Sequence, residues 1–377
     1  MEKIYLDNQA TTKPDPRVIN IMSEYYAEKF GNTSSIDYAR GWNANEALSI
    51  SRKKIARIIG ANPEQIILTS GATESINLAI RGTKPLNSDS NHNLITFKTE
   101  HRAVLDTFKS ISSNNYKSIF LDVNSNGKIN INKLEKNIDN NTIIVSVLHA
   151  NNEIGTIQNI KEISELLYSK GIILHIDAAQ SVGKIPIDIS KYKMCMLSFS
   201  SHKIYGPQGI GGLYISNDIK KILRPQITGG GHQFGFRSGT LPIALTVGFG
   251  KACEIALESI NCDNERIIEL TQLFEKNLKS IFPDLIINGH KNERIPGNLN
   301  ITLDGINNRS FIMKVPEIAL SRGSACTSSL EKRSHVLSAI GLTNNKIDSS
   351  IRFGIGRFNT KNEINEASNI IESRFRK

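Results

Sequence analysis

The sequence predicts an α/β fold: a mostly parallel sheet covered by helices on both faces, followed by a smaller α+β domain. Short apolar runs alternate with helical patterns over the first two thirds of the chain, which is typical of parallel strands joined by crossover helices. A helix-rich stretch begins near Leu241 and leads into further strands. The chain has 377 residues, which favours two domains over one.

The individual elements follow in order along the chain. Asp15-Pro16 is a helix start, because a carboxylate caps the first amides and proline fits the first turn. Further helices are expected near residues 45–59 and 161–169, and after Thr360. Apolar runs predict strands at residues 66–69, 94–97, 143–148, 172–176 and 194–199, and in the second domain near residues 298–303 and 351–354.

Composition and charge argue against several classes of protein. Hydrophobic residues make up 39% and charged residues 22%, so a sizeable core is expected. The 46 Lys and Arg against 36 Asp and Glu give a net charge of +10, but they form no run of five. This spread favours a solvated face, and direct nucleic-acid binding is not expected. No apolar stretch reaches the length of a membrane span, and the N-terminus lacks a signal core.

The four cysteines give no sign of a disulfide framework or a zinc site, because none forms a C-x-x-C pair. A reducing cytoplasm is therefore the expected location, and no resident metal is expected. Cys195 lies in an apolar strand and is interpreted as a core residue, and Cys253 and Cys262 are also interpreted as structural.

Polar side chains follow each of the first five strands, where the carboxyl ends of parallel strands form the ligand-binding edge of a sheet. These residues offer an anion-binding helix start, an imidazole, an amide, a carboxylate and an amine. In strand order they are Ala72 and Thr73, then His101, then Asn152, then Asp177 and Gln180, and finally Ser200, Ser201, His202 and Lys203.

Each of these residues also has a structural interpretation. Asp177 and Thr73 are suited to capping helices, and Asn152 to forming a turn. His101 fits a polar loop, and Lys203 fits a solvated loop beside a Gly-Pro turn. All five positions fall at one edge of one sheet, and this coincidence favours a functional site.

The set of groups matches the needs of pyridoxal phosphate. A partly shielded lysine forms a Schiff base with its aldehyde. A carboxylate keeps the ring nitrogen protonated, so that the ring acts as an electron sink. An imidazole stacks on the ring, and a helix start binds the phosphate.

At these residues the chain resembles the cysteine desulfurases, in the class V branch of the pyridoxal-phosphate-dependent aminotransferase superfamily. The resemblance covers nearly the whole chain in the family's order. The segments that carry it are residues 5–12, 69–75, 99–101, 151–155, 175–180, 200–212, 229–242 and 322–327.

The resemblance implies the fold and the domains. It implies fold type I, with a seven-stranded sheet in a large cofactor-binding domain at residues 15–255. Residues 1–14 and 256–377 would form the small α+β domain that carries Cys326. It also implies a homodimer, in which Thr240 reaches the phosphate bound by the other subunit.

The resemblance further implies a role for each site residue. Lys203 would carry the cofactor and shuttle the substrate Cα proton. His101 would stack on the ring and assist proton transfer. Asp177 would pair with the ring nitrogen, and Gln180 would bind the phenolic oxygen. Asn152 and Arg352 would bind the substrate carboxylate. The residues that would bind the phosphate are Ala72, Thr73, Ser200 and His202, with Ser201 beside them.

Cys326 is the implied nucleophile, in the Ser-Ala-Cys-Thr-Ser pattern of the family's group I. Its thiolate would attack the sulfur of L-cysteine, leaving L-alanine and a persulfide on Cys326. The persulfide would pass to an acceptor protein of iron–sulfur cluster assembly or of tRNA or DNA thiolation. Cys326 would also be a candidate to share an iron–sulfur cluster transiently with a partner.

Two departures from the family leave alternatives open. The segment after Cys326 is one residue shorter than usual and lacks a proline, and the chain ends soon after its last helix, which leaves room for a specialised acceptor. The alternatives are a selenocysteine lyase or class V aminotransferase, and a non-catalytic adaptor that keeps the fold. Turnover of cysteine, selenocysteine and a keto acid would separate the enzymes. Absence of a cofactor absorption band, with salt-sensitive binding to nucleic acid, would favour the adaptor.

Overall fold

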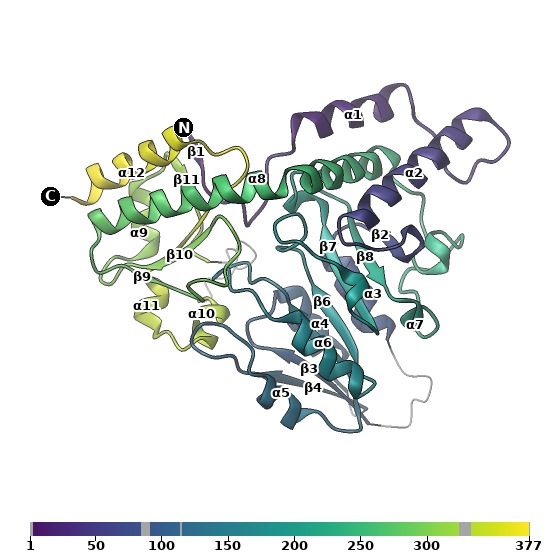
Figure 1. Cartoon of the computed structure of the whole chain (residues 1–377), viewed down its shortest axis with the longest axis horizontal. Coiled ribbons are helices and arrows are strands. Elements are labelled where there is room, and N and C mark those ends of the chain that lie inside the picture. Colours follow the sequence, from purple (N-terminus) through teal and green to yellow (C-terminus); the bar gives the residue numbers. More distant parts are fainter. Residues whose placement is uncertain (1–2, 84–90, 114, 324–332, 377) are drawn as a thin grey trace.

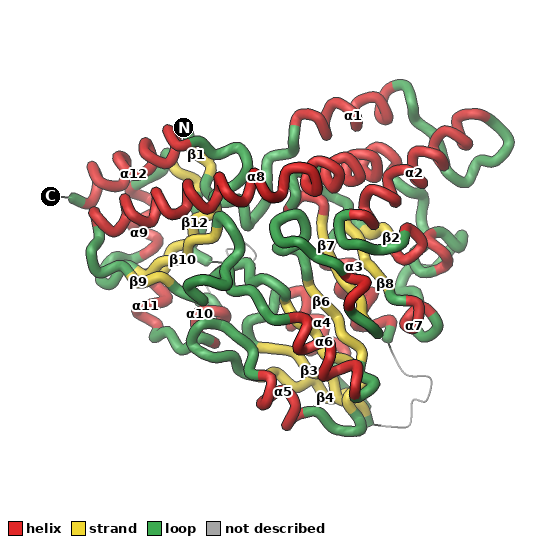
Figure 2. The backbone as a smooth tube through the Cα atoms, viewed as in Figure 1, coloured by secondary structure: helices red, strands yellow, loops and turns green. Residues whose placement is uncertain are grey.

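The centre of the molecule is a seven-stranded sheet (Figures 1 and 2). The computed structural model describes residues 3–83, 91–113, 115–323 and 333–376. The strands of the sheet are β2 (Ile66–Thr69), β3 (His92–Phe97), β4 (Tyr116–Leu121), β5 (Thr142–Leu148), β6 (Ile173–Asp177), β7 (Cys195–Ser200) and β8 (Gly211–Ile215). Their order is β2-β8-β7-β6-β5-β3-β4, and only β8 runs against the others. The predicted α/β class and mostly parallel sheet are confirmed.

Both faces of the sheet are buried, which explains why its inner strands read as continuous apolar runs. Along β5, Val145 and Val147 belong to one hydrophobic core and Ile144 belongs to another. Alternating side chains of a strand point to opposite faces, so a strand covered on both sides needs apolar residues throughout.

Helices cover these two faces (Figure 1). The first begins as predicted, because Asp15 Oδ1 accepts a hydrogen bond from the backbone N–H of Arg17 at 3.0 Å. The second begins at Ala39, six residues before the predicted start. The helices are α1 (Pro16–Ala27), α2 (Ala39–Arg57), α3 (Ala72–Gly82), α4 (Arg102–Ile111), α5 (Ile131–Asn137), α6 (Ile160–Ser169) and α7 (Asn217–Lys220), with short 3₁₀ turns η1 (Pro63–Gln65), η2 (Ile189–Lys191), η3 (Ser201–Lys203) and η4 (Gln233–Gly235).

A single long helix, α8 (Ile243–Ile281), leads from this sheet to a second core. Phe249 packs in the large core and Phe274 in the second. The predicted division at residue 255 falls inside this helix and stays a prediction. None of the helices in the described part of the chain is long and apolar enough to cross a membrane.

The second core surrounds a three-stranded antiparallel sheet of order β12-β10-β9, with Ile4 and Leu6 from the N-terminus packed into it. A two-stranded parallel pair, β1 with β11, lies beside it. The elements are β1 (Ile4–Tyr5), β9 (Ile286–Ile287), β10 (Asn298–Thr302), β11 (Ile318–Ala319), β12 (Ser350–Gly354), α9 (Asn308–Lys314), α10 (His335–Ala339), α11 (Asn344–Asp348) and α12 (Lys361–Phe375).

Candidate active site

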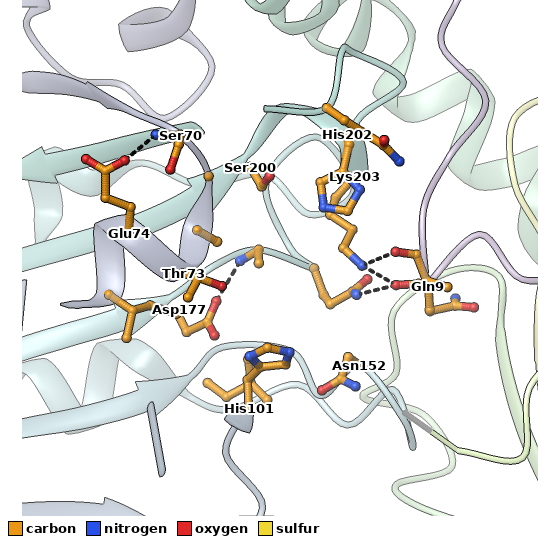
Figure 3. Close-up of a pocket in the computed structure, with 18 of the residues that line it drawn as sticks. Gln9, Ser70, Thr73, Glu74, His101, Asn152, Asp177, Ser200, His202 and Lys203 are labelled. Carbon is orange, nitrogen blue, oxygen red and sulfur yellow. Dashed lines mark hydrogen bonds between the residues drawn. The ribbon is translucent and has the colours of Figure 1, made fainter. Parts of the chain in front are cut away.

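A cavity of about 410 Å³ lies at the carboxyl ends of β2, β5, β6 and β7 (Figure 3). This volume is in the range of small-molecule sites. The wall also includes Gln9, Ala10 and Glu74, from outside the predicted set. The predicted residues that line it are Ala72, Thr73, His101, Asn152, Asp177, Gln180, Ser200, His202, Lys203 and Arg352.

Three predicted site residues do not appear in this wall. Ser201 is fully buried, and a Cβ added at Gly206 would lie 2.1 Å from its Oγ. Thr240 is exposed to solvent, as its predicted contact with a second subunit requires. Cys326 lies outside the described residues.

Lys203 is held by the N-terminal segment of the chain. It ends the turn η3 directly after β7, and its Nζ donates hydrogen bonds to the carbonyl oxygens of Gln9 at 2.5 Å and Ala10 at 2.7 Å (Figure 3). Backbone carbonyls orient the amine without supplying a countercharge. Sequence reasoning gave Gln9 and Ala10 no role, because a carbonyl acceptor has no side-chain signature.

Asp177 is a buried carboxylate that faces the cavity. It is the last residue of β6, and its Oδ1 accepts a hydrogen bond from the backbone N–H of Ala179 at 3.0 Å. Burial raises the pKa of Asp177 to about 6, against the opposing charge of Lys203. No ion pair within the described part of the chain satisfies it. A cationic group in the cavity would stabilise this carboxylate.

Two imidazoles in the wall stay neutral at neutral pH. His101 caps α4, and its Nδ1 accepts a hydrogen bond from the backbone N–H of Ala103 at 3.1 Å, which places the ring proton on Nε2. Burial, together with the charge of Lys203, lowers the pKa of His101 to about 4. The pKa of His202 is also lowered to about 4, chiefly by burial, and its Nδ1 lies 3.0 Å from Thr11 Oγ1. A neutral ring can lie against an aromatic cofactor without repelling a nearby cation.

The N-terminus of α3 supplies an anion-binding wall. Ala72 and Thr73 open this 11-residue helix, whose first amides lack helical acceptors. Glu74, in the same turn, accepts a hydrogen bond from the Ser70 N–H at 2.7 Å and pairs with Arg237 at 2.7 Å. The Arg237 guanidinium therefore balances the Glu74 charge, which would otherwise oppose an anion.

Arg352 is already engaged at both terminal nitrogens. It is 1% exposed, with Nη2 paired to Asp7 Oδ1 at 2.7 Å and Nη1 donating to the Asn152 carbonyl oxygen at 2.9 Å. Burial raises the pKa of Asp7, and the charge of Arg352 opposes that rise. A substrate carboxylate would therefore share Arg352 with Asp7, a residue to which sequence reasoning gave no role.

Glu153, next to Asn152, has an unusual environment. Its side chain is fully buried and forms no ion pair with any residue that the structure describes. Burial raises the pKa of Glu153 to about 7. A Cβ added at Gly323 would lie 2.9 Å from Oε1, so this carboxyl lies against the chain just before the predicted Cys326 segment.

The cysteines outside that segment differ in accessibility. Cys195 and Cys253 are buried, and burial raises the pKa of the Cys195 thiol to about 12 and that of Cys253 well above its usual value. Neither suits a thiolate nucleophile. Cys262 is exposed on α8, although we expected a structural residue.

Pyridoxal phosphate fits the donor set of this cavity. Lys203 supplies an amine, Asp177 a buried carboxylate without a described cationic partner, His101 a neutral ring, and α3 a helix N-terminus. These four groups match the aldehyde, the ring nitrogen, the ring face and the phosphate of this cofactor. Fold and site therefore define a pyridoxal-phosphate-dependent enzyme.

Comparisons with known proteins agree with that class. The family model for class V aminotransferases matches residues 4–366. A protein of Aeromonas hydrophila named cysteine desulfurase IscS is 44% identical over 98% of this chain and 91% of its own length. A solved "NifS-like protein" superposes with a TM-score of 0.91 at 32% identity, covering 98% of both chains. A structure titled "SspA in complex with cysteine" superposes with a TM-score of 0.84 at 32% identity, covering 95% of this chain and 100% of the SspA chain. The chain belongs to the class V aminotransferase family and, within it, to the cysteine desulfurases.

Proposed function

We propose that this chain is a cytoplasmic pyridoxal-phosphate-dependent cysteine desulfurase that converts L-cysteine to L-alanine and passes the sulfur, as a persulfide on Cys326, to an acceptor protein. The observation that carries the proposal is the single cavity that joins Lys203, Asp177 and His101 with the N-terminus of α3 (Figure 3). The similarity to proteins named cysteine desulfurase, and to one solved with cysteine, supports this substrate.

Each residue of the cavity has a role in this proposal. The cofactor, when bound, supplies an electron sink for negative charge at the substrate Cα. Lys203 would hold it through Nζ and would move the Cα proton at the same atom. Asp177 would keep a proton on the ring nitrogen, Gln180 would donate a hydrogen bond to the phenolic oxygen, and His101 would cover the ring face. These positions suit deprotonation at a carbon next to a carboxylate.

The remaining residues bind the charged ends of the ligands. The α3 amides at Ala72 and Thr73 bind the phosphate with Ser200 and His202, and Ser201 supports this turn from the interior. Arg352 and the Asn152 amide bind the substrate carboxylate, where Arg352 offers a charge-assisted hydrogen bond in a buried setting.

The reaction is tested with purified protein, cysteine and a thiol reductant. The expected result is equimolar alanine and sulfide, a cofactor absorption band, and a borohydride-stable mass increase on Lys203. Cys326→Ser should keep the band and the mass increase but lose the persulfide, seen by mass spectrometry. Labelled persulfide, followed into captured proteins, identifies the acceptor in iron–sulfur assembly or in tRNA or DNA thiolation. A protein that binds the cofactor but makes no alanine from cysteine would refute the proposal.

Asp177→Asn is expected to lower kcat/KM for cysteine by about 10²–10⁴-fold, the range for loss of one acid–base group. The amide keeps the shape of Asp177 but carries no charge to hold the proton on the ring nitrogen. Steady-state alanine formation measures the loss, and borohydride trapping should still give the mass increase on Lys203. Asp218→Asn, in the first turn of α7, is the control and should retain wild-type rates. Wild-type kcat/KM in Asp177→Asn would contradict the proposed role.

We also propose that the enzyme is a homodimer with Thr240 at the partner's phosphate. Three large apolar side chains, Ile36, Trp42 and Phe234, are exposed to solvent. Their two segments meet where Ser34 Oγ lies 3.2 Å from His232 Nε2, and His232 Nδ1 accepts a hydrogen bond at 3.3 Å from the backbone N–H of Gly239, the residue before Thr240. Exposed large apolar side chains gathered on two joined segments favour an interface, and a second copy is the occupant that the proposed Thr240 contact requires.

Ile36→Asp is expected to convert the dimer to a monomer, because it places a charge in the apolar interface. Ile36 is 75% exposed in the single chain, so the folded monomer should tolerate the change. Sedimentation velocity measures the mass of the particle in solution. Activity should fall when the dimer is lost, because the Thr240 contact is lost with it. Met313→Asp, equally exposed at 75% on α9, is the matched control and should stay dimeric. A dimeric Ile36→Asp variant would rule out this surface as the interface.

A further inference from the structure

Lys184 lies directly behind the active-site amide of Gln180. Its Nζ donates a hydrogen bond to Gln180 Oε1 at 3.1 Å. Lys184 does not line the main cavity, but it lines a small neighbouring one that also borders Gln9. Its charge therefore acts on the site through Gln180 and through space, without touching the ligands that the cavity would hold.

This contact fixes which end of the amide faces which neighbour. An amide has one accepting oxygen and one nitrogen with two hydrogens, and a cation beside it selects the oxygen. With Oε1 turned to Lys184, Gln180 Nε2 donates to the carbonyl oxygen of Gln9 at 2.9 Å. One hydrogen on Nε2 is used there. Because Gln180 lines the cavity, its second Nε2 hydrogen is available to a phenolic oxygen of the bound cofactor.

This series of hydrogen bonds ends at Lys203. The Gln9 carbonyl oxygen that accepts a hydrogen bond from Gln180 also accepts one from Lys203 Nζ at 2.5 Å. Lys184 and Lys203 are therefore linked through the Gln180 amide and the Gln9 carbonyl. Each ammonium disfavours a proton on the other, since like charges in a buried setting repel.

Among the residues that the structure describes, no carboxylate forms an ion pair with Lys184. Asp263, in the same small cavity, pairs instead with Arg357 at 2.7 Å. The pKa of Lys184 is lowered to about 7, chiefly by burial and to a lesser extent by the positive charges of Lys203 and Arg352. The titratable groups that act on or flank Lys203 and Lys184 are Asp7, His101, Asp177, His202, Tyr205, Asp263, Arg352 and Arg357.

We propose that Lys184 is a positioning residue that presents the Gln180 N–H to the phenolic oxygen of the bound cofactor and lowers the proton affinity of Lys203 Nζ. This inference rests on the proposed function. Both effects act in one direction. A nearby positive charge disfavours a proton on Lys203 Nζ. A hydrogen bond to the phenolic oxygen stabilises the anionic form of that oxygen, which then attracts the proton on Nζ less strongly. The amine is thereby kept ready to accept a proton near neutral pH.

The test is a pH titration of the absorption band of the cofactor-loaded protein, without substrate. In Lys184→Met, which keeps the chain length but loses the charge and the donor, the spectral pKa is expected to rise by about one pH unit. Lys184→Arg keeps a cationic donor at every pH of the titration, so its spectral pKa should not rise above the wild-type value. Lys191→Met replaces an exposed lysine seven residues further along the chain and is the matched control, so its spectral pKa should equal that of the wild type.

A merely structural role for Lys184 would change stability but leave the spectral pKa in place. An unchanged spectral pKa in a folded Lys184→Met protein therefore overturns the proposal, and Lys184→Gln supplies the same neutral test should the methionine variant not fold. Adding Lys184→Met to a Gln180→Ala protein should raise the spectral pKa by less than adding it to the wild type, because part of the effect passes through the amide. A wild-type protein with no cofactor band would instead refute the proposed function.

Discussion

Replacing Lys203 with alanine is expected to reduce alanine formation from cysteine by at least about 10⁴-fold, because covalent attachment and proton transfer at the substrate Cα are lost together. The site should otherwise persist. Asp177 is held by the Ala179 amide, and the N-terminus of α3 does not depend on Lys203. Cofactor should therefore still bind without a covalent bond, giving a shifted absorption band and no mass increase after borohydride treatment.

The comparison variant for this experiment is Lys221→Ala, on an exposed lysine after α7. It removes the same number of atoms and the same charge and should keep wild-type rates. A Lys203→Ala protein that still gains the borohydride-stable mass would show that another amine holds the cofactor. The assignment of Lys203 would then be wrong.

Replacing Glu153 with glutamine is expected to stabilise the protein at pH 8 by about 3 kcal/mol and to change little at pH 4. Burial raises the pKa of Glu153 from 4.5 in the unfolded chain to about 7 in the folded one. The folded state thus binds more protons in this window, and the wild-type stability falls as pH rises from 4.5 through 7. Glutamine is neutral at every pH and removes this dependence.

Urea unfolding midpoints of wild type and variant, measured between pH 4 and pH 8, give the comparison. Glu46→Gln, on the exposed side of α2, is the matched control and should follow the wild-type profile. Parallel profiles for wild type and Glu153→Gln would mean that Glu153 is ionised and compensated in the folded protein. The buried, unpaired carboxyl of the structure would then be the wrong description.

The sequence predicted the inner strands well but missed two strands of the same sheet. Strands β5, β6 and β7 are buried on both faces, so their apolar runs are continuous and easily recognised. At the sheet edge, β4 is only partly buried and mixes polar with apolar residues. Strand β8 opens with Gly211 and Gly212, which resemble a turn, yet a Cβ at Gly211 would lie 2.7 Å from the Cα of Gly71. Close packing, and not a turn, requires that glycine.

The side chains of the cavity were predictable because each follows the end of a strand, and strand ends gather by topology. Asp177 and Lys203 are both found in this way. The contacts of the N-terminal segment were not predictable in the same manner. Gln9 and Ala10 act through backbone carbonyls, and Asp7 reaches Arg352 from a distant part of the chain. Only tertiary folding brings these groups together.

The uninterrupted helix α8 has a mechanical consequence. At 39 residues it is about 58 Å long, with Phe249 embedded in one core and Phe274 in the other. Two bodies joined by a loop pivot freely, but two bodies joined by a continuous rod move apart only by bending it. Arg352, on the smaller body, is therefore kept at a nearly constant separation from Lys203 on the larger one. The position of Arg352, which we propose binds the substrate carboxylate, is thus set by the scaffold before any substrate arrives.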